Sequence, residues 1–194
     1  FVPYGLPSFD EKATPGYNYD VAKAKQLLAE AGHPGGKGLP AIKLLTNPTY
    51  KDIAEYVQKQ LAEIGIAIDV EIMQPSLLRD QMLKGKATFF RGSWIADYPD
   101  AESFLSVFYG NVPAPPNYTR FKSAEFDSLY TLSLKATNQE ERFALYQAMD
   151  RIIVEEAPIV PLYYDEVLRF VRKGVTGLEP NAMNLLDLRK VKVN

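Results

Sequence analysis

The sequence has no cysteine and only one histidine, His33, among its 194 residues. The absence of cysteine excludes disulfides and thiolate chemistry. One histidine leaves too few ligands for a zinc centre and makes a Ser-His pair hard to build. A glycine-rich phosphate loop and a Gly-x-Ser-x-Gly elbow are missing too. We therefore expect no catalytic residue, no metal and no cofactor.

Long apolar runs and an excess of positive charge are also missing. No apolar stretch approaches the roughly 20 residues that cross a bilayer. The 22 Lys and Arg residues against 24 Asp and Glu give a net charge of −2, and without a basic stripe no nucleic-acid partner is expected. The 46% hydrophobic and 24% charged residues are typical of a globular protein. A start at Phe1 without a signal peptide indicates an excised piece or a processed product.

Helix and strand signals alternate from residue 20 to residue 96, with short connections. This order favours an α/β fold with a parallel or mixed sheet and helices on its faces. Two helices are predicted next, over residues 123–134 and 139–156, and then strands over 159–164, 166–171 and 188–193. Residues 1–19 carry three prolines and no periodicity, so we expect an extended lead-in. The domain prediction is therefore this lead-in, a lobe over residues 20–174 and a tail over 175–194.

The rest of the chain is organised around one stretch, residues 89–105, in which we predict a strand, a turn and a helix. Residues 88–96 are rich in β-branched, aromatic and small side chains, which predicts a strand covered on both faces. Asp100 is suited to cap a helix over residues 101–109. Trp94, Asp97 and Tyr98 would then gather at the carboxyl end of a strand, where open α/β sheets bind ligands. The alternative is ordinary turn chemistry, since Asp and Pro are common in turns.

Two asparagines are further candidates for a ligand site. Asn47 follows a predicted strand over residues 41–46, so it would also lie at a carboxyl strand end. Asn117 lies in a proline-rich loop over residues 111–121 and could reach a cleft. For Asn117 we favour the alternative of a surface loop, because loops are exposed by default.

Five motifs give the chain a family resemblance. In the same order and spacing, they resemble segments of the extracytoplasmic solute-binding proteins of family 5, the oligopeptide- and dipeptide-binding proteins of ABC importers. The motifs are Tyr19-Asp20 to Gly32, Ala54-Glu55 to Ile66, Trp94-x-x-Asp97-Tyr98-Pro99-Asp100, Glu125-Phe126-Asp127-x-Leu129 and Ala157-Pro158 to Tyr163.

The resemblance implies a type II periplasmic-binding-protein-like lobe, with a mixed sheet and helices on both faces. It implies the later lobe of a two-lobed protein that binds peptides or similar small solutes in the cleft between its lobes and delivers them to ABC permease subunits. The missing first lobe is then a partner, and the tail would return toward it. The expected location is periplasmic or extracytoplasmic, with a lipid anchor on the full-length protein as one option.

The resemblance also implies roles for residues. An Asp at the position of Asp97 pairs with the α-ammonium of the peptide, and Trp94 packs nearby. Dipeptide-specific members carry an Arg pair after an Asn-Pro, where this sequence has Lys51 and Asp52. That departure leaves dipeptide specificity open, and we interpret both residues as a solvated helix start.

Two other functions compete with the binding module. A hydrolase could use the carboxylates of Asp97 and Asp100, although a spacing of three residues across a turn gives no reason for opposed pKa values. A sensor or scaffold could keep the binding-protein fold and signal to a partner instead. The sequence does not exclude the sensor.

Overall fold

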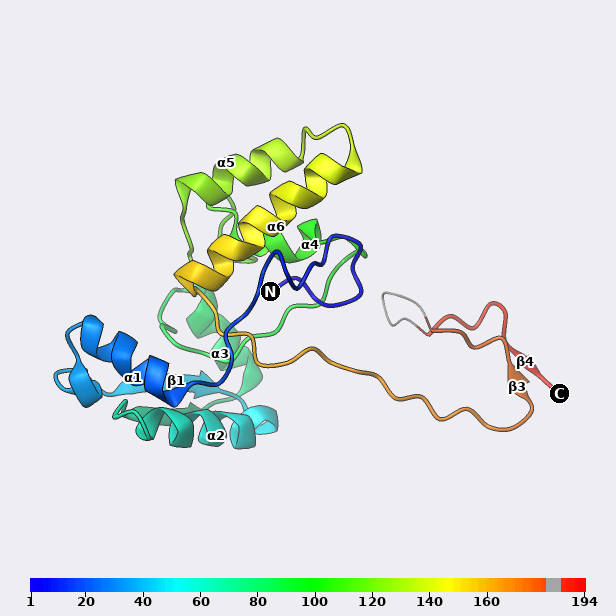
Figure 1. The fold of residues 1–194 in the computed structure, drawn as a ribbon. Coiled ribbons are helices and arrows are strands. Elements are labelled where there is room, and N and C mark those ends of the chain that lie inside the picture. The colour runs from blue at the N-terminus through cyan, green and yellow to red at the C-terminus, as the bar shows by residue number, and fades with distance from the viewer. Residues whose placement is uncertain (181–185) are drawn as a thin grey trace. The chain divides into compact units, whose positions relative to one another are not determined.

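The computed structural model describes residues 1–180 and 186–194, and it divides into two compact units (Figure 1). One unit comprises residues 16–93, and the other comprises residues 1–15 together with 94–194. The boundaries predicted for the lobe, at residues 20 and 174, stay a prediction.

The unit of residues 16–93 is a small α/β layer. Its elements are α1 (Val21–Glu30), η1 (Pro34–Gly36), β1 (Ile42–Thr46), η2 (Pro48–Tyr50), α2 (Lys51–Ala62), β2 (Ile68–Ile72) and α3 (Pro75–Leu83). Strands β1 and β2 pair in parallel, with Ile42 opposite Ile68 and Thr46 opposite Ile72. Parallel strands need a crossover, and α2 provides it.

Helices cover both faces of the parallel pair. Leu44 packs in one cluster with Ala54 of α2, and its neighbour Leu45 packs in another with Leu78 of α3. Because successive side chains of a strand point to opposite faces, α2 and α3 lie on opposite faces of β1. The predicted α/β arrangement with helices on both faces is confirmed here.

The strand predicted over residues 88–96 is much shorter in the structure. Only Phe90 bridges to β1, where the amide of Leu45 donates to the carbonyl of Phe89 at 3.0 Å and that of Arg91 donates to Leu45 at 2.9 Å. Beyond it the described residues offer no further ladder, and Ile95 is 81% exposed. The composition favours a strand, but a strand forms only where a partner supplies the hydrogen bonds.

The second unit is mainly helical. It contains α4 (Glu102–Leu105), η3 (Ser106–Phe108), α5 (Ala124–Ser133) and α6 (Gln139–Glu156), followed by the short antiparallel pair β3 (Val175–Thr176) and β4 (Lys192–Val193). Figure 1 shows α5 and α6 as an antiparallel hairpin joined by a short loop. Its core contains the fully buried Leu105, Phe126, Met149 and Ile153.

Residues 1–15 also belong to this core, which corrects the expected extended lead-in. Turns replace an extended chain at residues 4–8 and 11–13. Val2 is only 4% exposed, and its amide donates to the carboxylate of Asp150 on α6 at 3.2 Å. The prolines that suggested a lead-in are therefore compatible with a segment that packs against a helix.

The two strands predicted over residues 159–164 and 166–171 are wrong for this structure. That segment has no regular secondary structure, and its apolar side chains face solvent, with Val160 68%, Leu168 80% and Phe170 92% exposed. Within the described residues no strand pairs with it. The predicted strand over 188–193 is reduced to β4, and residues 181–185 of the tail lie outside the described part. None of the described helices is long and apolar enough to cross a membrane.

Candidate functional site

Trp94 and Asp97 are both fastened to Ser103 in α4. The indole nitrogen of Trp94 donates to the main-chain carbonyl of Ser103 at 2.7 Å. The backbone amide of Asp97 donates to the side-chain oxygen of the same serine at 3.0 Å. Ser103 is only 2% exposed, so one buried residue fixes both ends of the segment 94–97.

The helix that follows this segment differs from the one predicted over residues 101–109: it begins at Glu102, with Ala101 as its N-cap residue, and it is shorter. Asp100 is not its N-cap residue; its carboxylate accepts a hydrogen bond from the amide of Glu102, two residues on, at 2.9 Å, as aspartate does in turns. Instead of continuing to residue 109, the α-helix ends at Leu105 and passes into the 3-10 turn η3. Leu105 at the end of α4 and Phe108 in η3 are buried and belong to the core of this unit.

Glu102 gathers two tyrosines around its carboxylate. The hydroxyls of Tyr98 and Tyr130 donate to its two oxygens, and the ring of Tyr109 stacks on Tyr130 at 4.4 Å. The hydrogen bond to Glu102, with some burial, raises the pKa of Tyr98 to about 12. Burial first, and then the bond to Glu102, raises the pKa of Tyr130. Both tyrosines therefore stay neutral donors at physiological pH.

The carboxylate of Asp100 also has partners within the protein. Its second oxygen lies 3.5 Å from the guanidinium of Arg142 on α6. Burial raises the pKa of Tyr146, and the nearby Asp100 raises it further by its charge and a hydrogen bond. Asp100 thus ties the turn to α6, and Arg142 offsets its charge.

Asp97 differs from its two acidic neighbours. Its residue is exposed, and within the described residues no hydrogen bond or ion pair involves its carboxylate. Of the three carboxylates between residues 97 and 102, two are used inside the protein and one is open to solvent on a backbone that Ser103 anchors. Such a group can accept a hydrogen bond from an ammonium or guanidinium.

Asn117 serves its own loop. It is 3% exposed, and its amide nitrogen donates to the carbonyls of Tyr109 at 3.3 Å and Phe121 at 3.0 Å. Its oxygen accepts from Thr119 and from the amide of Phe121, each at 3.1 Å. All four hydrogen-bonding positions of the side chain are therefore occupied. A ligand at Asn117 would have to displace a loop contact.

Asn47 lies in the unit of residues 16–93, at the end of β1. Its side-chain oxygen accepts from the amide of Thr49 at 3.0 Å and so caps η2. Its grouping with Trp94 and Asp97 stays a prediction. Lys51 pairs with Glu55 one turn along α2, at 3.5 Å and half exposed, as a solvated helix start would.

Sequence reasoning missed two features of these segments. Ser103 carried no signal, because a serine inside an apolar helical pattern does not reveal which main-chain group forms a hydrogen bond with its hydroxyl. Arg91 carried no signal of a contact either, yet its guanidinium lies 3.2 Å above the centre of the Tyr50 ring. Such stacking fixes the direction of the guanidinium.

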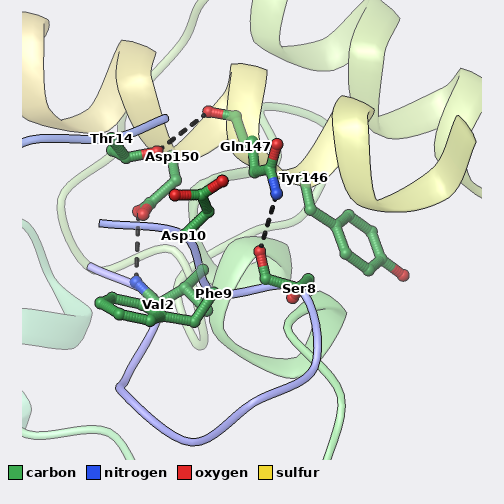
Figure 2. A pocket seen from close by; sticks show the side chains of 8 residues that line it. All are labelled: Val2, Ser8, Phe9, Asp10, Thr14, Tyr146, Gln147 and Asp150. Carbon is green, nitrogen blue, oxygen red and sulfur yellow. Dashed lines mark hydrogen bonds between the residues drawn. The ribbon is translucent and has the colours of Figure 1, made fainter. Parts of the chain in front are cut away.

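The pocket drawn in Figure 2 is a separate feature. It is lined by Val2, Ser8, Phe9, Asp10, Thr14, Tyr146, Gln147 and Asp150. Gln147 on α6 donates to the carbonyl of Ser8 at 3.1 Å, and Val2 donates to Asp150 (Figure 2). These contacts join residues 1–15 to α6, and none of the predicted ligand residues lines the pocket. We therefore interpret it as a packing feature.

Comparison with known sequences gives a family match and several relatives. Residues 1–115 match the model of the bacterial extracellular solute-binding proteins, family 5 middle region. Heme-binding protein A of Haemophilus influenzae is 35% identical over 152 residues, which cover 75% of this chain and 28% of that protein. Dipeptide-binding protein DppE of Bacillus subtilis is 30% identical over 173 residues, covering 87% and 31%. Glutathione-binding protein GsiB of Escherichia coli is 29% identical, covering 82% and 33%. The chain thus spans about a third of the length of these relatives.

Solved structures agree with the fold. DppA of Helicobacter pylori, an ABC transporter-associated periplasmic binding protein in complex with the peptide STSA, is 27% identical and superposes with a TM-score of 0.78 over 98% of this chain and 38% of its own. AppA of Clostridium difficile is 22% identical with a TM-score of 0.83, covering 98% and 40%. The predicted type II periplasmic-binding-protein-like fold is confirmed.

Proposed function

Because the chain belongs to the bacterial extracellular solute-binding proteins of family 5, we propose that it is the later lobe of a two-lobed protein that binds peptides and delivers them to an ABC importer. The whole protein would close its two lobes on the ligand, with binding favouring the closed state. The fold over nearly all of the chain and its one-third coverage of the relatives support this reading.

The observation that carries the proposal is the open carboxylate of Asp97. Asp100 and Glu102 are already bonded to Arg142, Tyr98 and Tyr130. A peptide brings one α-ammonium, and one free acceptor suits it. When water is excluded by closure, the charge-assisted hydrogen bond between them becomes stronger than it is in solution.

Trp94 and Tyr98 complete the proposed site on this lobe. Trp94 is half-buried against the core with its indole nitrogen bonded to Ser103, which leaves part of the ring as a wall for the ligand. Tyr98 is 45% exposed beside Asp97. Asn47 is proposed to contribute from its strand end, and Asn117 only if its loop contacts yield.

The proposal needs no covalent step. The alternative of a hydrolase requires Asp97 and Asp100 to act as an acid and a base on one bond. Asp100 is bonded to the amide of Glu102 and paired with Arg142, which leaves it poorly suited to proton transfer. We therefore propose a binding protein and not an enzyme.

The proposal also covers the partners of the whole protein and its location. The partners would be the ABC permease subunits and the first lobe, which would meet the exposed segment 159–171. The protein would act outside the cytoplasmic membrane. A lipid anchor on the full-length protein stays a prediction, as does the sensor alternative.

The names of the relatives suggest the experiment. Dipeptides and glutathione carry a free α-amino group, whereas haem carries carboxylates and no amine. The full-length protein should be titrated calorimetrically with a tripeptide library and with haem, and bound peptides should be recovered and weighed by mass spectrometry. We expect a peptide to bind with a Kd of about 1 μM or tighter, roughly −8 kcal/mol, and to be recovered uncleaved. Binding of haem without any peptide, or recovery of cleaved peptide, would contradict the proposal.

A further inference from the structure

A hydrogen bond joins the buried Ser103 to Asp97, the residue proposed to bind the ligand ammonium. We propose that Ser103 is a positioning residue, whose buried hydroxyl holds the backbone of Asp97 so that its carboxylate faces the ligand ammonium. The inference rests on the proposed function of Asp97. It adds a specificity determinant that does not itself touch the ligand.

The geometry makes Ser103 a rigid support. Its neighbours Ala101 and Leu105 are 2% and 0% exposed, so α4 is seated in the core on both sides of it. The amide of Ser103 donates to the carbonyl of Asp100 at 3.2 Å. The hydroxyl oxygen that accepts from Asp97 therefore has little freedom to move.

Two atoms of Ser103 serve two site residues. The side-chain oxygen accepts a hydrogen bond from the amide of Asp97 at 3.0 Å, and the main-chain carbonyl accepts one from the indole nitrogen of Trp94 at 2.7 Å. A substitution by alanine removes the first bond and keeps the second. The contribution to Asp97 can thus be tested without loosening the tryptophan.

Glu102 does not supply the same constraint. Its carboxylate holds the hydroxyls of Tyr98 and Tyr130, and no described hydrogen bond joins it to Asp97. Among the described residues, the Asp97 amide donates one hydrogen bond to a side chain, and the acceptor is the hydroxyl oxygen of Ser103. Without it the segment between Trp94 and Asp100 would sample more conformations, and each binding event would have to order it again.

The test uses four versions of the full-length protein and a burial-matched control. The versions are wild type, Ser103→Ala, Asp97→Asn and the double variant. Ser133→Ala is the control, since Ser133 is also 2% exposed and bonds a main-chain carbonyl, that of Tyr130, at 2.7 Å. Calorimetry follows the tightest member of a free-amino tripeptide library and its N-acetylated form.

We expect Ser103→Ala to weaken free-amino peptide binding by about three- to tenfold, the range of one lost neutral hydrogen bond. Acetylated peptide should change less than twofold, and so should either peptide with Ser133→Ala. In the Asp97→Asn background Ser103→Ala should add little, because residues that act through one another are not additive. Amide hydrogen exchange at Asp97 should speed up at least tenfold in Ser103→Ala, with no ligand present.

Failures of the two ideas are distinguishable. If Asp97→Asn leaves free-amino peptide binding unchanged, the proposed role of Asp97 falls and the role of Ser103 falls with it. If Asp97→Asn weakens binding but Ser103→Ala does not, or weakens both peptides equally, only the positioning role is overturned. Unchanged exchange at the Asp97 amide would overturn it as well.

Discussion

The carboxylate of Glu102 should stabilise the unit that carries Asp97, and Glu102→Gln tests this. The substitution keeps the shape of the side chain and removes its charge. Glutamine still offers one acceptor oxygen, but its NH2 group cannot accept the second hydroxyl. One of the bonds from Tyr98 and Tyr130 is therefore lost, and the other loses its charge assistance.

The size of the effect can be worked from these two bonds. The pKa of Tyr98 is raised from 10.0 to about 12, and two pKa units are worth about 2.7 kcal/mol in full. Tyr98 is 45% exposed, so solvent screening reduces its share to about 1 kcal/mol. Weakening the bond from the buried Tyr130 adds about 1 kcal/mol. We expect the free energy of unfolding to fall by about 2 kcal/mol.

The sign with pH follows from the raised pKa of Tyr98. Its neutral form is favoured in the folded state, so the stabilisation is fully present below the unfolded pKa of about 10. It is lost as the pH rises through the folded value of about 12. The difference between wild type and Glu102→Gln should therefore be largest near neutral pH and shrink above about pH 10.

Urea unfolding followed by the fluorescence of Trp94, the single tryptophan of the chain, reports on this unit. Ring-carbon NMR of labelled tyrosine gives the pKa of Tyr98, which should fall toward 10 in the variant. Glu155→Gln is the matched control, since Glu155 is exposed on α6 and the charge change is the same. Equal stability of the two variants, or an unchanged pKa of Tyr98, would refute the reasoning.

Two further predictions concern the backbone. Gly65 has φ +88°, and a Cβ there would collide with the carbonyl of Gly35, so Gly65→Ala should cost at least about 2 kcal/mol. Thermal unfolding should show a clear drop in Tm, whereas Gly16→Ala, with open space around it, should change little; equal Tm values would contradict the account. Ala157 ends α6 in the left-handed region at φ 47°, so Ala157→Gly should stabilise by about 0.5 kcal/mol. A fall in Tm with that variant would show that the backbone there is not strained.

Local signals predicted the helices well. Asp20 caps α1 through the amide of Lys23 at 2.8 Å, and α6 spans the predicted residues with Asn138 as its cap. Caps and apolar periodicity act within a few residues, so the sequence alone specifies them. The apolar stripe of α1 is nevertheless only half-covered, with Leu27 48% exposed, because burial depends on what packs against it.

Strands were predicted less well, for a physical reason. Residues 88–96 and 159–171 have strand-like composition, but a strand exists only with a hydrogen-bonded partner, and composition does not provide one. If the chain is one lobe of a larger protein, some partners belong to segments outside it. The same limit explains why residues 1–15 were expected to extend when they pack on α6.

The ligand-binding roles of Trp94, Asp97 and Tyr98 stay a prediction. Their closeness in sequence needs no structure, but the strand at whose carboxyl end they are predicted to lie does not extend beyond the bridge at Phe90. Ser103 and Glu102 hold the segment that carries them instead. The anchoring by Ser103 and the occupied amide of Asn117 could not be predicted, since both depend on which backbone atoms meet across a loop. Such contacts leave no periodic signal.

The measurement that tests the central claim most directly is peptide binding by Asp97→Asn in the full-length protein. A buried ammonium that loses its counter-charge costs about 2–5 kcal/mol, so affinity for free-amino peptides should fall by roughly thirtyfold or more. N-acetylated peptides should bind wild type weakly and respond little to the substitution. Equal binding of free and acetylated peptides by wild type, or an equal loss for both in Asp97→Asn, would contradict the account.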